Sequence, residues 1–322
     1  MYILYSNIFD PYFNIAAEEY LLKNSYDDVF FIYRNEPSII VGKHQNAIKE
    51  INLHYVKSSD IKVVRRISGG GTVYHDLGNV NFTFITSSDE GKQVDFERYT
   101  SPILQVLSTL NIPAVFSGKS DLTIDGKKIS GNAAHVFKTK ALHHGTLLFN
   151  SQLDKLNEAL KVNLDKFSDK AVASRRSEVT NICGYLKQPV SIEEFMDDII
   201  TRVTIDFDTD YERSFNQGEI RRIGDLVKDK YGTWDWNFGY SPKYSYTTSF
   251  MSKQISLDVV KGRIENVHSP DDESSNRELE ELKKTLINVP HSPAEIKNKL
   301  QENIKSLTIT GFDIDKFVEQ LF

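Results

Sequence analysis

Residues 65–76, Arg-Arg-Ile-Ser-Gly-Gly-Gly-Thr-Val-Tyr-His-Asp, constrain the fold of this chain more than any other stretch. The apolar run 61–64 before them and the alternating run 80–85 after them are each typical of a β-strand, so the glycines form a connection between strands. Glycine lets backbone N–H groups turn toward a ligand where a Cβ would obstruct it, and arginine adds a permanent planar charge. The stretch therefore predicts an anion-binding loop, with a simple charged β-turn as the alternative.

This loop matches neither of the two common nucleotide-binding patterns. It lacks the G-x-x-x-x-G-K-[ST] sequence of P-loop proteins, and it lacks a G-x-G-x-x-G sequence that opens a helix. We therefore expect any phosphate bound here to be held in a different arrangement.

A second cluster of polar residues, 127–131, follows the turn signal Asp125-Gly126. Lys128, just before a Ser-Gly pair, could reach a phosphate or a carbonyl oxygen on which charge develops. The alternative is a charged hairpin without a function. Asp121, on the preceding strand, is a candidate to contact a nucleotide amino group or a metal ion.

Two adjacent histidines, His143 and His144, lie on a predicted strand and so point to opposite faces, which makes a shared metal site difficult. No cysteine or carboxylate stands nearby at zinc-ligand spacing. We expect one histidine in the core and the other at a site. The one cysteine, Cys183, lies in an apolar run and is expected to be a buried structural residue rather than a nucleophile.

Composition narrows the class of protein. The 322 residues carry a net charge of −6, which argues against bulk nucleic-acid binding. No segment reaches the ~20 apolar residues of a membrane helix, and the first residues show no basic, signal-like region. A single cysteine fits a reducing compartment. We expect a cytoplasmic protein that binds neither nucleic acid nor membrane.

The hydrophobic pattern predicts an α+β (α/β) chain with two domains, at residues 1–246 and 247–322. We expect an amphipathic helix capped near Asn14, a helix from Pro102 to Leu110, and a basic loop at 166–179. After residue 247 a β-hairpin and three helices predict a small α+β domain.

Several of these motifs together resemble the lipoate–protein ligase A family. They are the glycine loop with its continuation to Asn79, the stretch 125–133 followed by His143-His144-Gly145-Thr146, and the segments 14–22 and 34–46. Residues 230–242, which contain both tryptophans, are similar to the family's closing motif, and residues 257–264 to its accessory domain. The resemblance covers most of the chain.

The resemblance implies a fold and a reaction. The expected fold is a large catalytic domain around a mixed β-sheet of the biotin/lipoate ligase type, with a small C-terminal α+β accessory domain. The implied reaction activates lipoate with ATP and Mg²⁺ to lipoyl-AMP and transfers the lipoyl group to a lysine of a carrier. The implied carriers are a 2-oxoacid dehydrogenase E2 lipoyl domain or the glycine cleavage H protein.

The resemblance also implies roles for individual residues. Lys128 is expected to be catalytic, touching both the lipoyl carbonyl and the phosphate. The expected ATP contacts are Arg66, Gly71, Thr72, Val73, Tyr74, Asn79, Asp121 and Lys128. The expected lipoyl contacts are Ser68, Gly70, His75, Lys128 and His144. Metal ligands are left unassigned.

We also expect the loop 166–179 to close over the intermediate, because a mixed anhydride must be kept from water. An apolar tunnel for the lipoyl tail takes Ile39, Val41 or Phe82, with core packing as the alternative for each. The main rival activity is a lipoyl or octanoyl transferase of the same fold without ATP-dependent activation. An octanoyl transferase of this kind would need a nucleophilic cysteine, whereas a transferase that uses preformed lipoyl-AMP stays open as a second alternative.

Overall fold

The computed structural model describes the chain except for residues 88–93, 161–165, 175–176, 210, 251–252, 270–276 and 305–311. The chain forms two compact units that alternate along the sequence. The first comprises Met1–Lys43, Ile61–Asn157 and Ser174–Thr233, and the second comprises His44–Asp60, Glu158–Ala173 and Trp234–Phe322.

An eight-stranded sheet forms the centre of the first unit in the part of the chain that the structure describes. β1 pairs in parallel with β2 and β12, whereas β6 pairs antiparallel with β2 and β10, and β10 antiparallel with β9. The sheet is therefore mixed, as the family resemblance implied. In spatial order the strands are β12 (Glu212–Arg213), β1 (Tyr2–Ser6), β2 (Val29–Tyr33), β6 (Asn79–Ser87), β10 (Lys140–Leu148), β9 (Lys127–Phe137), β8 (Asp121–Ile124) and β7 (Val115–Ser117).

The glycine loop belongs to a separate, three-stranded sheet of the same unit. β3 (Ser38–Val41) pairs in parallel with β4 (Lys62–Arg65) and antiparallel with β5 (Val73–His75). The loop therefore connects β4 to β5, two outer strands of one small sheet. The short strand β5 lies inside residues 65–76, which were predicted to be a loop. The sequence did not predict this strand, because its three residues are too few for a visible alternation.

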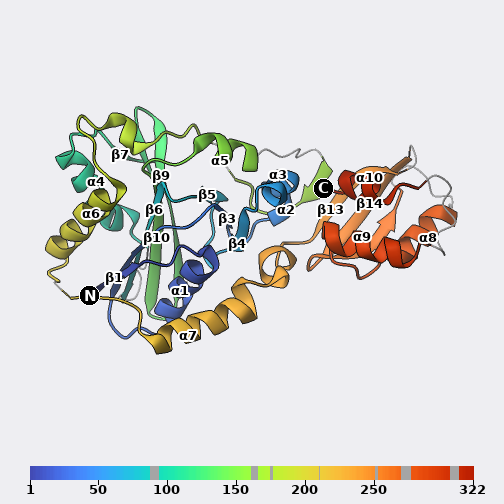
Figure 1. Ribbon diagram of the computed structural model, residues 1–322, viewed down its shortest axis with the longest axis horizontal. Helices are drawn as coiled ribbons and strands as arrows, with labels where there is room; N and C mark the ends of the chain where they lie inside the picture. Colours follow the sequence, from blue (N-terminus) through green and yellow to red (C-terminus); the bar gives the residue numbers. More distant parts are fainter. Residues whose placement is uncertain are drawn as a thin grey trace. The chain divides into compact units, whose positions relative to one another are not determined.

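Alternation along β6 divides the central sheet into two chemically different faces. Val80, Phe82 and Phe84 enter an apolar core together with residues of α4 (Phe96–Thr109) and α6 (Ile192–Asp206). Asn79, Asn81 and Thr83 are equally buried but point to the opposite face. Figure 1 shows α4 and α6 on one side of the sheet and α1 (Pro11–Asn24) on the other.

α1 differs from its prediction in two ways. It begins at Pro11 rather than near Asn14, because the Asp10 carboxylate accepts hydrogen bonds from the N–H groups of Tyr12 and Phe13 at 2.7 and 3.1 Å. It is also not amphipathic, since its polar residues Asn14, Glu18 and Glu19 are buried along with its apolar ones.

α4 also begins earlier than predicted. Asp95 caps it by accepting from the Arg98 N–H at 3.0 Å, so the helix starts at Phe96 and Pro102 lies inside it. The helix continues past the proline because it buries Tyr99, Ile103 and Val106 in the core. Tertiary packing thus offsets the lost backbone hydrogen bond.

The remaining helical segments of the first unit are short. They are α5 (Leu153–Ala159), which begins in this unit, η2 (Ile182–Tyr185), α7 (Gln217–Leu226) and the π-helical turn η3 (Val227–Tyr231). Among the residues that the structure describes, no helix is both long and apolar enough to cross a membrane.

The second unit has its own sheet and core. Its strands, in order, are β11 (Phe167–Asp169), β13 (Tyr244–Phe250), β14 (Lys253–Val260) and β15 (Arg263–His268). Its helices are α2 (Ala47–Glu50), α3 (Leu53–Ser58), the π-helical turn η4 (Asp235–Gly239), α8 (Arg277–Leu286), α9 (Pro293–Glu302) and α10 (Ile314–Gln320). The hairpin and three C-terminal helices agree with the sequence prediction, whereas β11 lies in the expected loop 166–179.

Candidate active site

Arg66 holds the glycine loop together from within. It is buried, and its Nη2 donates to the carbonyl oxygens of Gly69 and Gly71 at 2.6 and 2.7 Å. Since the N–H of a trans peptide points away from its C=O, the N–H groups of Gly70 and Thr72 are directed away from Arg66. Gly70 has φ +86°, a conformation open to glycine, so the middle position of the three consecutive glycines cannot readily take another residue.

Burial lowers the pKa of Arg66 to about 10, and the Glu18 carboxylate opposes this effect. Arg66 therefore stays charged at neutral pH. Its neighbour Arg65 is fully buried and donates to the carbonyl oxygens of Gly42 and Lys43 at 2.9 and 3.1 Å. Both arginines thus bind backbone carbonyls around the loop.

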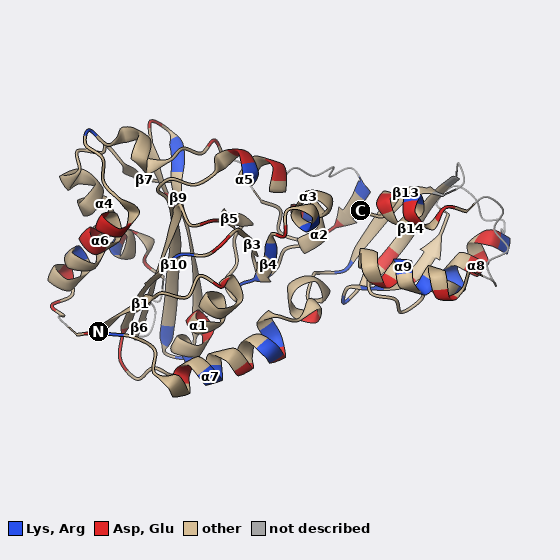
Figure 2. Ribbon diagram, viewed as in Figure 1, with Lys and Arg blue, Asp and Glu red and all other residues tan. Residues whose placement is uncertain are grey.

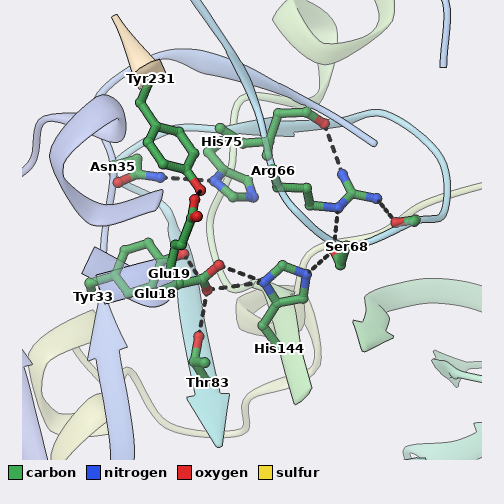
Figure 3. Close-up of polar contacts among 12 residues, drawn as sticks. Glu18, Glu19, Tyr33, Asn35, Arg66, Ser68, His75, Thr83, His144 and Tyr231 are labelled. Atoms are coloured by element: carbon green, nitrogen blue, oxygen red, sulfur yellow. Dashed lines mark hydrogen bonds and ion pairs between the residues drawn. The ribbon is translucent and has the colours of Figure 1, made fainter. Parts of the chain in front are cut away.

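Ser68 and His144 connect the glycine loop to the central sheet. The Ser68 Oγ lies 2.6 Å from His144 Nε2 and accepts from Arg66 Nε at 2.9 Å. His144 Nδ1 lies 2.8 Å from Glu18 Oε2 on α1, as Figure 3 shows. In the neutral imidazole the Nδ1–H donates to the carboxylate, so Nε2 accepts from the serine hydroxyl.

Glu18 is the centre of this network. Besides His144, it accepts from the Thr83 hydroxyl at 2.6 Å and from the Tyr33 hydroxyl at 3.0 Å (Figure 3). Burial, and then the nearby Glu18 charge, raise the pKa of Tyr33 well above its usual value. The phenol therefore stays protonated and acts as a donor. A buried carboxylate with three donors fixes their positions relative to one another.

His75 is held as a neutral donor. Asn14 Nδ2 donates to Asn35 Oδ1 at 2.9 Å, which turns the Asn35 Nδ2 toward His75 Nδ1 at 3.1 Å. Nδ1 must then accept, so Nε2 carries the proton. Burial, followed by the Arg66 charge, lowers the pKa of His75 to about 3.

Lys128 reaches Asp121 because β9 contains a β-bulge. Thr123 pairs with Lys128 but Leu122 pairs with Ser130, so β9 has one extra residue at this point. The bulge places Lys128 and Gly131, three positions apart, on the same face of the strand. Lys128 Nζ lies 3.0 Å from Asp121 Oδ1, and both side chains are partly exposed.

A second segment fixes the backbone of Lys128. Its N–H donates to the Glu178 carbonyl at 2.8 Å, and its carbonyl accepts from the Thr180 N–H at 3.1 Å. Ser174, earlier in the same segment, accepts from the Thr72 N–H at 2.9 Å through its Oγ. In the predicted covering loop 166–179, of which residues 175–176 lie outside the described residues, Ser174 thus contacts the glycine loop and Glu178 contacts the Lys128 strand.

The other predicted residues are placed as follows. Asn79 is fully buried; its amide accepts from the Thr146 hydroxyl and donates to Asn81 at 2.9 Å. Val73 and Tyr74 lie in β5, with Tyr74 buried and Val73 partly exposed. Phe82 lies on the core face, away from Glu18 and His144, which favours its alternative reading as a core residue.

The two adjacent histidines separate as the strand geometry predicts. His143 is buried against the ring of Tyr99, with centroids 4.4 Å apart, while His144 joins the polar network. Cys183 is partly buried, and burial raises the pKa of its thiol. Within the described residues, no group of three or more His, Cys, Asp or Glu side chains could hold a metal ion.

The sequence analysis missed Glu18, Tyr33, Asn35 and Thr83. A signal for two of them was present. Asn14 and Glu18 are four residues apart and share one helix face, and Thr83 continues the polar alternation of Asn79 and Asn81. Tyr33 and Asn35 carry no comparable signal, since their partners come from distant segments.

Comparison with known families identifies the class. Residues 10–204 match the lipoyl protein ligase A/B catalytic domain, and residues 243–321 match the C-terminus of bacterial lipoate protein ligases. The chain is therefore a member of the lipoyl protein ligase class, with both the catalytic and the C-terminal part.

The relatives are more specific. Lipoate–protein ligase 1 of Staphylococcus aureus is 41% identical over 308 residues, covering 94% of this chain and 93% of that protein. The lipoate–protein ligase LplJ of Bacillus subtilis is 42% identical over 274 residues, covering 83% of each chain. This chain belongs to the lipoate–protein ligase family, as the sequence resemblance predicted.

Solved structures agree with the fold. P. falciparum LipL1, in complex with lipoate, has a TM-score of 0.64 at 26% identity and covers 99% of both chains. A lipoate–protein ligase A bound with ATP has a TM-score of 0.63 at 27% identity, covering 74% of this chain and 98% of its own. A bipartite ligase of Thermoplasma acidophilum, described with its E2 lipoyl domain, has a TM-score of 0.65 at 28% identity, covering 74% and 96%.

Proposed function

We propose that this chain, a lipoate–protein ligase by family, attaches lipoate to a carrier lysine in two steps. In the first, a carboxylate oxygen of lipoate attacks the α-phosphorus of ATP, and the bond to pyrophosphate breaks. In the second, the carrier amine attacks the carbonyl carbon of lipoyl-AMP, and AMP leaves. The observation that carries this proposal is the position of Lys128, beside Asp121 and across Gly131.

Lys128 is the proposed catalytic residue. Charge builds on the phosphoryl oxygens in the first step and on the carbonyl oxygen in the second. An ammonium group held by Asp121, on a residue whose backbone is fixed by two hydrogen bonds, can stabilise both without reorganising. Removal of one such charge-stabilising contact costs about 3 kcal/mol of barrier in comparable sites.

The glycine loop is the proposed site for the adenylate. The Gly70 N–H, which is directed away from Arg66, is suited to a phosphate oxygen, and Gly71 to Tyr74 would lie along the nucleotide, while the Thr72 N–H already donates to Ser174 Oγ. Arg66 contributes by fixing the loop carbonyls and by its charge. Asn79 and Asp121 are the proposed contacts on the nucleotide side.

The network around Glu18 is the proposed lipoyl site. Ser68, Gly70, His75 and His144 are the proposed contacts for the lipoyl carboxylate end. The neutral Nε2–H of His75 can donate to an oxygen of the substrate. Ile39 and Val41, both buried in β3, are the remaining proposed tunnel residues.

Mg²⁺ fits the Asp121 side of this site. Mg²⁺ is usually held by one or two carboxylates together with nucleotide phosphates, and Asp121 is a carboxylate beside Lys128 that is about one-third exposed (34%). When bound, the ion would neutralise phosphate charge. We assign no further protein ligand to it.

The carrier is proposed to be an E2 lipoyl domain or a glycine cleavage H protein. The proposed catalytic part is residues 1–246 and the proposed accessory part residues 247–322. ATP-dependent chemistry on such carriers, with a single unpaired cysteine, suits the cytoplasm.

The loop 166–179 is proposed to cover lipoyl-AMP, supported by the contacts of Ser174 and Glu178.

The rival octanoyl transferase needs an activated cysteine. Cys183 has a raised pKa, and its thiol lies 3.4 Å from Asn150 Oδ1, an amide oxygen that cannot act as a base. A thiol of this kind is mostly protonated at neutral pH and is a poor nucleophile. This favours the ATP-dependent ligase.

Lipoate-dependent exchange of pyrophosphate into ATP tests the first step, and mass spectrometry of an unlipoylated E2 lipoyl domain tests the second. We expect a lipoyl increment that requires ATP. Lys128→Ala should abolish exchange, whereas Lys127→Ala provides the matched control, because Lys127 pairs with the exposed Glu178 instead. Equal exchange by the two variants would contradict the role of Lys128.

A further inference from the structure

A cluster of cationic side chains surrounds a single buried carboxylate on α1. Glu19 Oε1 accepts from Lys23 Nζ at 2.5 Å, and Glu19 Oε2 accepts from Lys230 Nζ at 2.6 Å and from the Tyr231 hydroxyl at 2.5 Å. One negative charge thus faces two positive ones. Burial acts to raise the pKa of Glu19, but these hydrogen bonds lower it overall, so the carboxylate is ionised.

Lys43 and His135 extend this cluster. Burial, and then repulsion from Lys43, lower the pKa of His135. Burial also lowers the pKa of Lys230, with Glu19 opposing and Lys23 and Lys43 adding to the effect. We call Lys23, Lys43 and Lys230, together with the adjoining neutral His135, the cationic cluster. Its three lysines exceed its one carboxylate, although the whole chain has a net charge of −6.

The cationic cluster adjoins the proposed lipoyl site. Lys43 donates its backbone N–H to the Ser68 carbonyl at 2.8 Å. On β9, Ala133 lies directly opposite His144, and His135 is two residues further along the same face. A partner bound at the cluster would therefore reach the glycine loop and the lipoyl group.

β9 offers backbone as well as charge beside this cluster. β8 pairs with β9 only as far as Gly131, so among the described strands β10 alone pairs with residues 132–137. At the end of this stretch, Lys23 Nζ and Lys138 Nζ lie 5.5 and 5.4 Å from the ring centroid of Phe137, which is partly exposed. Basic residues mark both ends of the β9–β10 pair in Figure 2.

We propose that Lys23, Lys43, Lys138 and Lys230, together with Phe137 and the adjoining edge of β9, bind an acidic, extended segment of the carrier domain next to its acceptor lysine. This inference rests on the proposed function. The acceptor lysine is a cation that must approach Lys128, and acidic neighbours on the carrier offset that repulsion. A nucleotide triphosphate would use the charges but neither the aromatic ring nor the strand edge.

The test uses the full chain and an unlipoylated E2 lipoyl domain as the probe. In the Lys23→Gln/Lys138→Gln variant, we expect the KM for the lipoyl domain to rise roughly fivefold at low salt. The difference should shrink as ionic strength increases, because salt screens exposed charges. Lipoate-dependent pyrophosphate exchange, which needs no carrier, should keep its rate. Lys187→Gln, at an exposed lysine before α6, is the matched control.

Each outcome separates this inference from the proposed function. An unchanged KM and salt dependence for the lipoyl domain would overturn the docking surface. A raised KM for ATP in the exchange reaction would assign the charges to the triphosphate and overturn it as well. Absence of exchange in the unaltered chain would instead refute the ligase itself. Lys138→Glu should be rescued by a lipoyl domain in which an acidic residue near the acceptor is changed to lysine.

Discussion

Gly131 leaves the space in which the Lys128 side chain lies. A Cβ built on Gly131 would be 2.9 Å from both Cε and Nζ of Lys128, closer than side-chain atoms normally approach. The β-bulge puts the two residues on one face, and the missing side chain lets the ammonium cross the strand to Asp121. The Ser-Gly that follows Lys128 is therefore a geometric requirement of the lysine's position.

Gly131→Ala should displace Lys128 without unfolding the chain. The clash involves only the far end of a flexible side chain, so the free energy of unfolding should change by about 0.5 kcal/mol or less. A displacement of about 1 Å can cost roughly 100-fold in rate, and we expect a loss of that order in lipoate-dependent exchange. Gly184→Ala, where a Cβ meets nothing within 4 Å, is the control and should keep full activity. Full activity in both variants would contradict this account.

Glu18→Gln should weaken lipoate activation and leave the fold of the central sheet intact. The amide cannot accept from three donors with the same strength, and it removes the charge that holds His144 and offsets Arg66. Hydrogen bonds to charged groups are worth about 1.5–3 kcal/mol, so we expect roughly a 10- to 100-fold loss in kcat/KM for lipoate.

Thr83→Val distinguishes the carboxylate's charge from its packing. It removes one hydrogen bond to Glu18 but leaves the charge and the His144 contact in place. Its loss in kcat/KM should be clearly smaller than that of Glu18→Gln, with circular dichroism spectra matching for both. Equal losses would show that packing around Thr83, rather than the Glu18 charge, sets the activity.

The sequence predicted those parts of the site that are continuous along the chain. The glycine loop and the Asp121-to-Gly131 hairpin are local, so periodicity and turn residues locate them. The split between His143 and His144 followed from strand geometry alone, and the structure bears it out.

The parts that it missed depend on contacts between distant segments. Glu18 on α1 meets Thr83 and His144 on two strands of the central sheet, and its spacing from Asn14 does not reveal which distant strands it contacts. The start of α1 at Pro11, after its cap Asp10, and the start of α4 before Pro102 were missed because capping and core packing override local propensity.

Asp10→Ala should destabilise the first unit by about 1 kcal/mol, because α1 loses its N-terminal cap. Asp10→Asn keeps a capping oxygen and should cost only a fraction of this, although both variants lose the partly exposed contact with Lys62. Urea unfolding followed by circular dichroism measures the difference. Equal destabilisation by the two substitutions would assign the effect to the Lys62 ion pair instead.

His291 should make the second unit sensitive to acid. It is fully buried, 2.6 Å from the Tyr244 hydroxyl, and burial lowers its pKa from 6.5 to about 3. Above pH 6.5 the ring is neutral in both folded and unfolded chains, whereas between pH 6.5 and about 3 only the unfolded chain takes up the proton. The free energy of unfolding should therefore fall by about 1.4 kcal/mol between pH 7.5 and 5.5, since the unfolded state binds more protons.

Both tryptophans, Trp234 and Trp236, lie in this unit, so their fluorescence during urea unfolding reports it. His291→Gln should lower stability at pH 7.5 and flatten this pH dependence; an unchanged slope would show that other groups cause the acid sensitivity.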